Sequence, residues 1–296
     1  MNVVSSCLVR KAIVPVAGAG TRLFPLTKAQ PKEMLPVGRK PVVQHVVEEL
    51  RLAGIEQILL ITGRNKNSIE NHFESDGESN RFSGWQSDID RDSISGTDGI
   101  HRVLYTRQDL PTGVADAVAL GREFAAGETV VVAFGDTILS SSDLLVRLIA
   151  AHRESQASCT LAVEEVRAED VSRYGVVGIR KEGGRVFASD LVEKPEPDRA
   201  TSNLAVVPRY VFEPSIFDTI EATSPGRGGE RWLTDAIVNL VNHSPPVRVV
   251  PLNPGEQRYD IGNFASYYRA FIDFALDDCE HGEAVRRYVG GLDGLV

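Results

Sequence analysis

The chain has 296 residues, of which 42% are hydrophobic and 25% charged; this balance is typical of a folded globular protein and excludes a disordered or fibrous one. Its 41 acidic and 32 basic side chains give a formal net charge of -9, which disfavours nucleic acid and anionic membranes as partners. Three widely spaced cysteines indicate a reduced compartment and support neither a disulfide framework nor a zinc cluster. Because the first residues lack a secretory pattern and no apolar run reaches about 18 residues, we expect a cytoplasmic protein.

The first half of the chain alternates short runs rich in β-branched residues with longer segments of helical spacing. These patterns predict strands at 11–17, 56–62, 101–107 and 129–134, and helices at 41–53, 66–74, 114–126 and 142–156. Helical connections of this length join parallel strands, so the sheet should be mainly parallel with helices on both faces. The predicted fold class is therefore α/β.

Residues 74–100 are dominated by Ser, Asp and Gly, and we expect a mobile loop there. A connection of this length is either functional or disordered, and we favour disorder. Further along, the patterns predict strands at 159–166, 174–180, 185–193 and 203–212, which would make small antiparallel additions to the sheet, and helices at 213–222, 234–242 and 263–277. The Gly-rich C-terminal tail at 276–296 yields no clear prediction.

A glycine turn follows the first predicted strand. Gly18 and Gly20 would let the backbone approach a ligand closely, and Arg22 and Lys32 supply positive charge, which together favour a phosphate-binding loop. A dinucleotide-binding fingerprint would need a small residue where Leu23 stands, so an NAD enzyme is not indicated. By themselves, two glycines after a strand more often form only a tight turn.

The residues around this turn carry a more specific signal. The segment 18–41 reads G-x-G-T-R-L-x-P-x-T-K-x-x-P-K-E-M-L-P-x-x-x-K-P, which resembles the signature of sugar-1-phosphate nucleotidyltransferases, most closely the bacterial UTP–glucose-1-phosphate uridylyltransferases. The likeness continues in the same order through KNSIENHF (66–73), YGVV (174–177), EKP (193–195), SNLAVVPRYV (202–211), LTDAI (233–237) and DIGN (260–263). It spans residues 10–275, which we therefore expect to form a single nucleotidyltransferase domain.

The resemblance implies a Rossmann-like, mixed but mainly parallel sheet of the nucleotide-diphospho-sugar transferase type. It also implies transfer of a nucleotidyl group from a pyrimidine nucleoside triphosphate, preferably UTP, to a hexose-1-phosphate, preferably glucose-1-phosphate, with Mg2+ as cofactor and pyrophosphate as the second product. The family's dimers and tetramers imply a homo-oligomer. A sugar phosphate is already an ionised nucleophile, so alignment and charge neutralisation can replace a catalytic dyad.

The resemblance also assigns roles to charged residues. Asp136 and Asp260 match the metal ligands, in keeping with the preference of Mg2+ for a few carboxylate oxygens plus water and phosphate. Arg22 and Lys32 match catalytic residues that grip the triphosphate, and Lys194 matches the one that meets the sugar phosphate. The substrate-binding residues that it implies are Ala17, Gly18, Gly20, Thr21, Gln108, Gly113, Gly175 and Glu193.

Several positions depart from the uridylyltransferase pattern. The insertion 109–112 and the GDTI at 135–138 resemble thymidylyltransferases more than uridylyltransferases. Uracil and thymine differ by one methyl group, which changes the binding free energy in an apolar pocket by only about 1–3 kcal/mol. Base choice, UTP or dTTP, therefore stays open. Pro208, Arg231 and Trp232 also depart from the pattern and leave the sugar open; for Trp232 we favour a core or dimer contact over a sugar platform.

A nonenzymatic nucleotide-sugar sensor on the same fold is the alternative from another class. A sensor has no need of contacts to a leaving group. The presence of Arg22, Lys32, Asp136, Lys194 and Asp260 therefore favours an enzyme.

Overall fold

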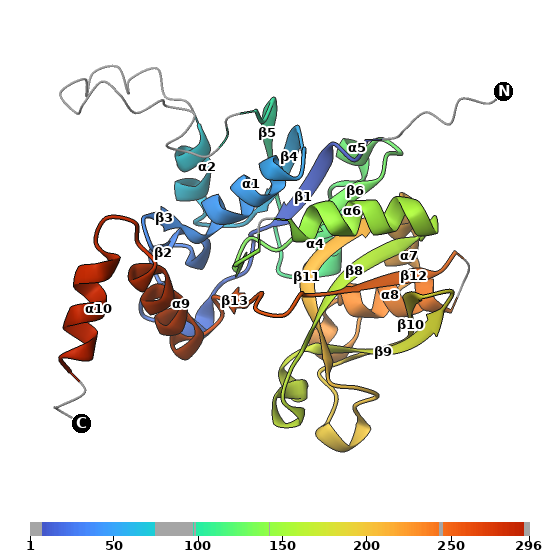
Figure 1. Ribbon diagram of the computed structural model, residues 1–296. Helices are drawn as coiled ribbons and strands as arrows, with labels where there is room; N and C mark the ends of the chain where they lie inside the picture. The colour runs from blue at the N-terminus through green and yellow to red at the C-terminus, as the bar shows by residue number, and fades with distance from the viewer. Residues whose placement is uncertain (1–7, 75–96, 98, 142, 243–244, 293–296) are drawn as a thin grey trace.

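The computed structural model describes residues 8–74, 97, 99–141, 143–242 and 245–292. Their centre is a nine-stranded sheet in the order β5-β4-β1-β6-β11-β8-β12-β10-β9 (Figure 1). Its first four strands are parallel: β1 (Lys11–Pro15), β4 (Gln57–Thr62), β5 (Arg102–Arg107) and β6 (Val130–Ala133). The parallel part of the prediction is confirmed. The loop expected at 74–100 lies almost entirely outside the described residues, which omit 75–96 and 98.

The second half of the sheet is mixed. β8 (Cys159–Glu165) runs antiparallel to β11 (Leu204–Phe212) and parallel to β12 (Val247–Pro251), while β9 (Gly175–Glu182) and β10 (Arg185–Glu193) form an antiparallel pair at the edge. β11 is also antiparallel to β6 and so joins the two halves. The antiparallel additions are confirmed, whereas β12 was not predicted.

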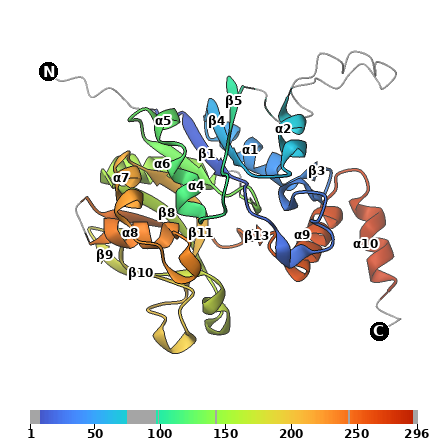
Figure 2. The ribbon, with the colours of Figure 1, turned by 180° about the vertical axis from the view of Figure 1, so that it is seen from behind.

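Helices cover both faces of the sheet, as predicted. α1 (Val42–Leu52) and α6 (Leu144–Ser155) lie on the face towards the viewer in Figure 1. α4 (Val114–Ala119), α7 (Ser215–Ala222) and α8 (Leu233–Val241) lie on the opposite face, which Figure 2 shows.

Alternate residues of the central strands point into these two layers. Ile13 and Val132 pack in the cluster with α4, α7 and α8, whereas Val14 and Val131 pack in the cluster with α1 and α6. A strand that is buried on both faces needs apolar residues at successive positions. This burial explains why the central strands read as continuous hydrophobic runs.

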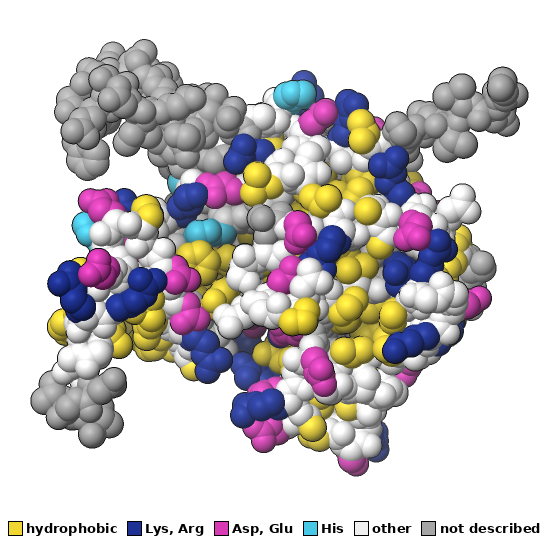
Figure 3. All heavy atoms as spheres, in the orientation of Figure 1, with side chains coloured by type: hydrophobic (Ala, Val, Ile, Leu, Met, Phe, Trp, Pro, Cys, Tyr) yellow, Lys and Arg dark blue, Asp and Glu magenta, His cyan; other side chains and the backbone are white. Residues whose placement is uncertain are grey.

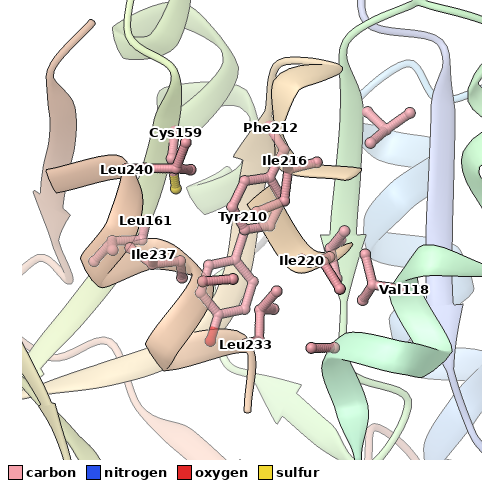
Figure 4. Packing of buried hydrophobic residues seen from close by; sticks show 14 of the residues in the cluster. Val118, Cys159, Leu161, Tyr210, Phe212, Ile216, Ile220, Leu233, Ile237 and Leu240 are labelled. Atoms are coloured by element: carbon pink, nitrogen blue, oxygen red, sulfur yellow. The ribbon is translucent and has the colours of Figure 1, made fainter. Parts of the chain in front are cut away.

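The layer under α7 and α8 is built around two aromatic rings of β11 (Figure 4). Tyr210 and Phe212 stack with ring centroids 5.4 Å apart and 16° between the ring planes. Ile216 of α7 and Leu233 and Ile237 of α8 surround them. Because each buried side chain of this kind contributes about 1.5–3 kcal/mol, the packing fixes the position at which α8 begins.

Residues 114–126 form two helices, α4 and α5 (Arg122–Ala125), and the single helix predicted there is wrong. Gly121 lies at the break, where a Cβ would be 2.3 Å from Cδ1 of Ile13. The chain turns where β1 leaves no room for a side chain. Helical periodicity carries no information about such a contact.

Short elements surround the end of β6. β7 (Thr137–Leu139) pairs with β13 (Arg258–Asp260), and β2 (Pro36–Val37) pairs with β3 (Lys40–Pro41). These strands were not predicted, because two or three residues cannot show a period. The remaining helices are the predicted α2 (Asn67–Phe73) and α9 (Phe264–Leu276) and, within the tail, the unpredicted α10 (Gly282–Gly290).

The cysteines form no disulfide among the described residues. Cys159 is buried, which raises the pKa of its thiol, and Cys279 is exposed. Cys7 lies outside the described residues. None of the helices in the described ranges combines the length and the apolar character that a membrane crossing requires.

Candidate active site

The two aspartates that the resemblance assigns to a metal line one cleft. Asp136 follows β6, at the carboxyl end of a parallel strand, where ligands collect in open α/β sheets. Asp260 ends β13 and pairs across the ladder with Thr137 of β7. The N–H of Ile261 donates to the carbonyl oxygen of Asp136 at 2.9 Å. Both aspartates line a cleft of about 350 Å³.

Charges in the cleft act strongly on one another. Lys32, on the 3-10 turn η2 (Lys32–Met34), forms an ion pair with Asp136. Burial opposes the charge of Lys32, but the carboxylates of Asp136, Glu33 and Asp260 outweigh burial and raise the pKa of Lys32. Burial likewise opposes the charge of Asp136, but Lys32 outweighs it and lowers the pKa of this carboxyl. Burial and the charge of Asp136 raise the pKa of Asp260.

This donor set fits Mg2+, which takes one or two protein carboxylates and completes its shell with water and substrate phosphate oxygens. Asp136 and Asp260 offer two carboxylates. Burial, and then repulsion from Asp136, raise the pKa of Asp260, and a divalent cation would relieve that repulsion. Within the described part of the chain, no group of three or more His, Cys, Asp or Glu side chains is placed to hold a metal. The cleft therefore fits a cation that shares its ligands with a substrate.

Arg22 lies beside Asp260. It belongs to the 3-10 turn η1 (Thr21–Leu23) and lines the same cleft. A Cβ on Gly262 would lie 2.9 Å from Nη2 of Arg22 and 3.0 Å from Oδ1 of Asp260. The glycine at 262 thus leaves space for the guanidinium close to the carboxylate.

The glycine turn brings Lys32 close to the end of β1. Gly20 has φ 66°, in the left-handed region that favours glycine, and Thr27 Oγ1 donates to its carbonyl oxygen at 2.8 Å. A Cβ on Gly18 would lie 3.7 Å from Cε of Lys32. Thr21 begins η1 directly after this turn.

The opposite wall of the cleft carries the residues expected to meet the sugar. Thr234 Oγ1 donates to Oε2 of Glu193 at 2.6 Å, and Lys194 Nζ lies 3.2 Å from Oε1 of the same carboxylate. A Cβ on Gly175 would lie 3.1 Å from Oε2 of Glu193. Gly175, Glu193 and Lys194 therefore lie together, with Thr234 as a partner that the sequence analysis did not single out.

Trp232 lines this wall as well. Nζ of Lys194 lies over its ring, 5.3 Å from the centroid, within the range of a cation–π contact. The indole therefore lies half-buried at the cleft and not in the core, which corrects the core contact that the sequence favoured. The physical reason is that Trp232 directly precedes α8, whose start is fixed by the packing of Leu233.

A second cavity of about 290 Å³ lies on the side expected to bind the base. Ala17 and Gln108 line it, and Gln108 Nε2 donates to the carbonyl oxygen of Gly113 at 3.0 Å. Gly113 has φ 117°, and a Cβ there would lie 2.3 Å from the carbonyl oxygen of Arg231. Segments 17–24 and 108–114 contribute residues to both this cavity and the cleft.

A polar hollow adjoins the cleft. It has a volume of about 530 Å³, lies between α9 and the 3-10 segment η4 (Ala168–Arg173), and shares Arg258 and Asp260 with the cleft. Figure 3 shows the surface hollowed there, with acidic and basic side chains around it. The cleft is thus open to solvent on the side of Asp260.

Sequence reasoning missed a buried ion pair beneath the site. Lys66 Nζ donates to Oε2 of Glu33 at 2.7 Å, and the two side chains are 6% and 2% exposed. Burial raises the pKa of Glu33, although Lys66 opposes this. Both residues stand in motifs that resemble the family, PKEMLP and KNSIENHF, so the motifs contained the signal, but only the contact reveals its use.

Comparisons with known proteins match nearly the whole chain. The family model described as nucleotidyl transferase matches residues 11–275. The chain is 39% identical over 294 residues to a putative UTP–glucose-1-phosphate uridylyltransferase of Methanocaldococcus jannaschii, with 96% of this chain and 100% of that protein covered.

Solved structures are similar over nearly the whole chain. An apo UDP-glucose pyrophosphorylase superposes with a TM-score of 0.83 at 32% identity, covering 91% of this chain and 99% of that one. A UTP-bound enzyme of the same kind from Acinetobacter baumannii gives a TM-score of 0.82 at 32% identity, covering 95% and 98%.

Proposed function

The chain belongs to the nucleotidyl transferase family, and on this premise we propose how the residues of its cleft perform the reaction. The protein is a sugar-1-phosphate nucleotidyltransferase that transfers a uridylyl group from UTP to glucose-1-phosphate and releases pyrophosphate. Of the alternatives left open by the sequence, dTTP as donor and a nonenzymatic sensor find less support, because the relatives above are named for UTP and UDP-glucose.

The observation that carries the proposal is that Arg22, Asp136 and Asp260 line one cleft with Glu193 and Lys194, while Lys32 forms an ion pair with Asp136. We assign Asp136 and Asp260 as the ligands of Mg2+. When bound, Mg2+ would neutralise phosphate oxygens and so allow two anionic substrates to meet. The carboxylate pair supports this role through the raised pKa of Asp260.

The basic residues divide between the two substrates. Lys194 would hold the sugar phosphate, one oxygen of which attacks the α-phosphorus of UTP. A new P–O bond then forms there, and the bond between the α-phosphorus and the bridging oxygen breaks, with its electron pair leaving on pyrophosphate. Arg22 and Lys32 would stabilise that developing charge, Arg22 with its planar fork and Lys32 as a compact charge.

The neutral residues would position the substrates. Gln108 and the backbone at Gly113 would read the pyrimidine edge, and Ala17, Gly18, Gly20 and Thr21 would line the path of the nucleotide. Glu193 would accept hydrogen bonds from sugar hydroxyls, with Gly175 giving space for the sugar. Support comes from the positions of Gln108 at the base cavity and of Glu193 in the cleft.

A substrate matrix tests the function. Four nucleoside triphosphates are combined with a panel of sugar-1-phosphates and Mg2+, and pyrophosphate and product mass are measured. We expect product from UTP and glucose-1-phosphate. Product from dTTP alone would contradict the donor assignment, and binding of UDP-glucose without turnover of any pair would favour a sensor.

Two variants test the roles. Asp136→Asn and Lys194→Ala should abolish most turnover while UTP binding partly survives. The matched controls are Asp198→Asn and Lys181→Ala, which change exposed residues of the same types away from the cleft. Full turnover in both test variants would contradict the assigned roles.

We also propose that residues 10–275 form the nucleotidyltransferase domain of a cytoplasmic homo-oligomer. Support for self-association comes from α9, where Tyr268, Phe271 and Ile272 are 56%, 43% and 49% exposed and lie on one helix face. Light scattering after size exclusion is the test. A monomer in the parent protein, or no change of mass in Phe271→Glu, would contradict the proposal.

A further inference from the structure

A fully buried arginine, Arg209, lies next to the cleft. Arg209 is 0% exposed and stands on β11 opposite Ala133 of β6. Its Nε and Nη2 donate to the carboxylate of Glu49 on α1, the shortest contact being 2.7 Å. A buried ion pair is a poor device for stability alone, because apolar side chains of similar volume often stabilise a core as well or better. The function of Arg209 should therefore be sought in its contacts with groups other than Glu49.

The remaining donors of Arg209 reach the backbone on both sides of Asp136. Nη1 donates to the carbonyl oxygens of Pro208 at 3.0 Å and Phe134 at 3.4 Å, and Nη2 donates to that of Thr137 at 2.8 Å. A guanidinium has five N–H donors in one plane, and here each nitrogen has acceptors. The side chain therefore joins residue 134, two positions before Asp136, to residue 137, directly after it.

The backbone that Arg209 holds at Thr137 is also hydrogen-bonded to the strand that carries Asp260. Thr137 is the cross-strand partner of Asp260, and the N–H of Ile261 donates to the carbonyl oxygen of Asp136. The register between β11 and β8 shifts between Val207 and Tyr210, an irregularity of the kind that re-aims a side chain. A displacement of Thr137 would thus move the backbone that carries both aspartates.

We propose that Arg209, held by Glu49, is a positioning residue that fixes the spacing of Asp136 and Asp260 for the divalent cation. This inference rests on the proposed function, which assigns the cation to these carboxylates. Because Glu49 offsets the charge of Arg209, the effect is geometric and passes through the backbone at Thr137. A lysine could pair with Glu49, but its compact ammonium cannot reach the carboxylate and three carbonyls at once.

Arg209→Lys therefore keeps the positive charge and removes the planar guanidinium that contacts Glu49 and three carbonyl oxygens at once. Mn2+ binding to the protein in the presence of UTP is measured as the loss of the electron paramagnetic resonance signal of free Mn2+ beyond the loss in a protein-free sample with the same Mn2+ and UTP. We expect binding to be about 10–100-fold weaker, as when residues that orient metal ligands are lost. We also expect kcat to fall while the KM for glucose-1-phosphate is unchanged. The double variant Arg209→Met with Glu49→Leu replaces the ion pair by apolar side chains and should show the same loss even if the lysine variant folds poorly.

Leu50→Ala is the matched control. Leu50 is buried in the same helix, next to Glu49, and its truncation opens a cavity and destabilises the fold. It should lower thermal stability and leave Mn2+ affinity unchanged. If the Arg209 variants bind Mn2+ as tightly as the parent, or if Leu50→Ala weakens binding equally, the positioning role is overturned. If the parent itself binds no Mn2+ with UTP, the proposed function fails, and the positioning role fails with it.

Discussion

Gly113→Ala tests whether the loop on the base side and the loop before α8 act as one unit. The new Cβ would lie 2.3 Å from the carbonyl oxygen and 2.7 Å from the amide nitrogen of Arg231, both backbone atoms that cannot rotate away. Gly113 also has φ 117°, a conformation in which an L side chain is strained by about 1–3 kcal/mol.

Relief of the clash would break the contacts between the loops. The N–H of Arg231 donates to Thr112 at 2.9 Å, and the N–H of Ala115 donates to Arg231 at 3.2 Å. Each backbone hydrogen bond contributes roughly 0.5–1.5 kcal/mol. We therefore expect the free energy of unfolding to fall by about 2–6 kcal/mol, strain and lost hydrogen bonds together. Because Gln108 donates to Gly113, the KM for UTP should rise.

Gly183→Ala is the control that separates strain from crowding. Gly183 has φ 56°, but among the described residues nothing lies within 4 Å of the Cβ it would gain. Strain alone should cost about 1–2 kcal/mol there and leave the KM for UTP unchanged. Urea unfolding and pyrophosphate release measure the two quantities. Equal losses of stability in the two variants, or an unchanged KM for UTP in Gly113→Ala, would refute the reasoning.

Three further predictions concern single contacts. Trp232→Ala should raise the KM for glucose-1-phosphate and not that for UTP, since a cation–π contact with Lys194 contributes about 0.5–2 kcal/mol; equal changes in both constants would contradict it. Glu33→Gln should lower the free energy of unfolding by about 3–5 kcal/mol, because Lys66 is left buried and unpaired, and adding Lys66→Met should recover part of that loss in urea unfolding. The hydrogen bond from His152 and other contacts lower the pKa of Glu213 from its ordinary value of 4.5, so its contribution to stability is present above pH 4.5 and is lost as pH falls below that value. Glu213→Gln should therefore flatten the loss of stability in urea unfolding as pH falls below 4.5.

The sequence by itself determined the central sheet and most of its helices. β1, β4 and β6 are buried on both faces, so each appears as an uninterrupted apolar run, and their connections contain helices with the expected spacing. The motifs also named residues that the structure brings to one cleft: Arg22, Asp136, Glu193, Lys194 and Asp260. The position of Asp136 just beyond the carboxyl end of a buried parallel strand follows from the same apolar run.

Only the tertiary structure decided how these residues meet. Asp260 lies beside Asp136 because two three-residue strands pair, and Trp232 reaches the cleft because Leu233 is anchored in the core. Arg209 joins Glu49 to the backbone at Thr137 across large separations in the chain. Periods of 2 and 3.6 residues describe what neighbours along the chain share, whereas these contacts are selected by packing between distant segments, which no local pattern records.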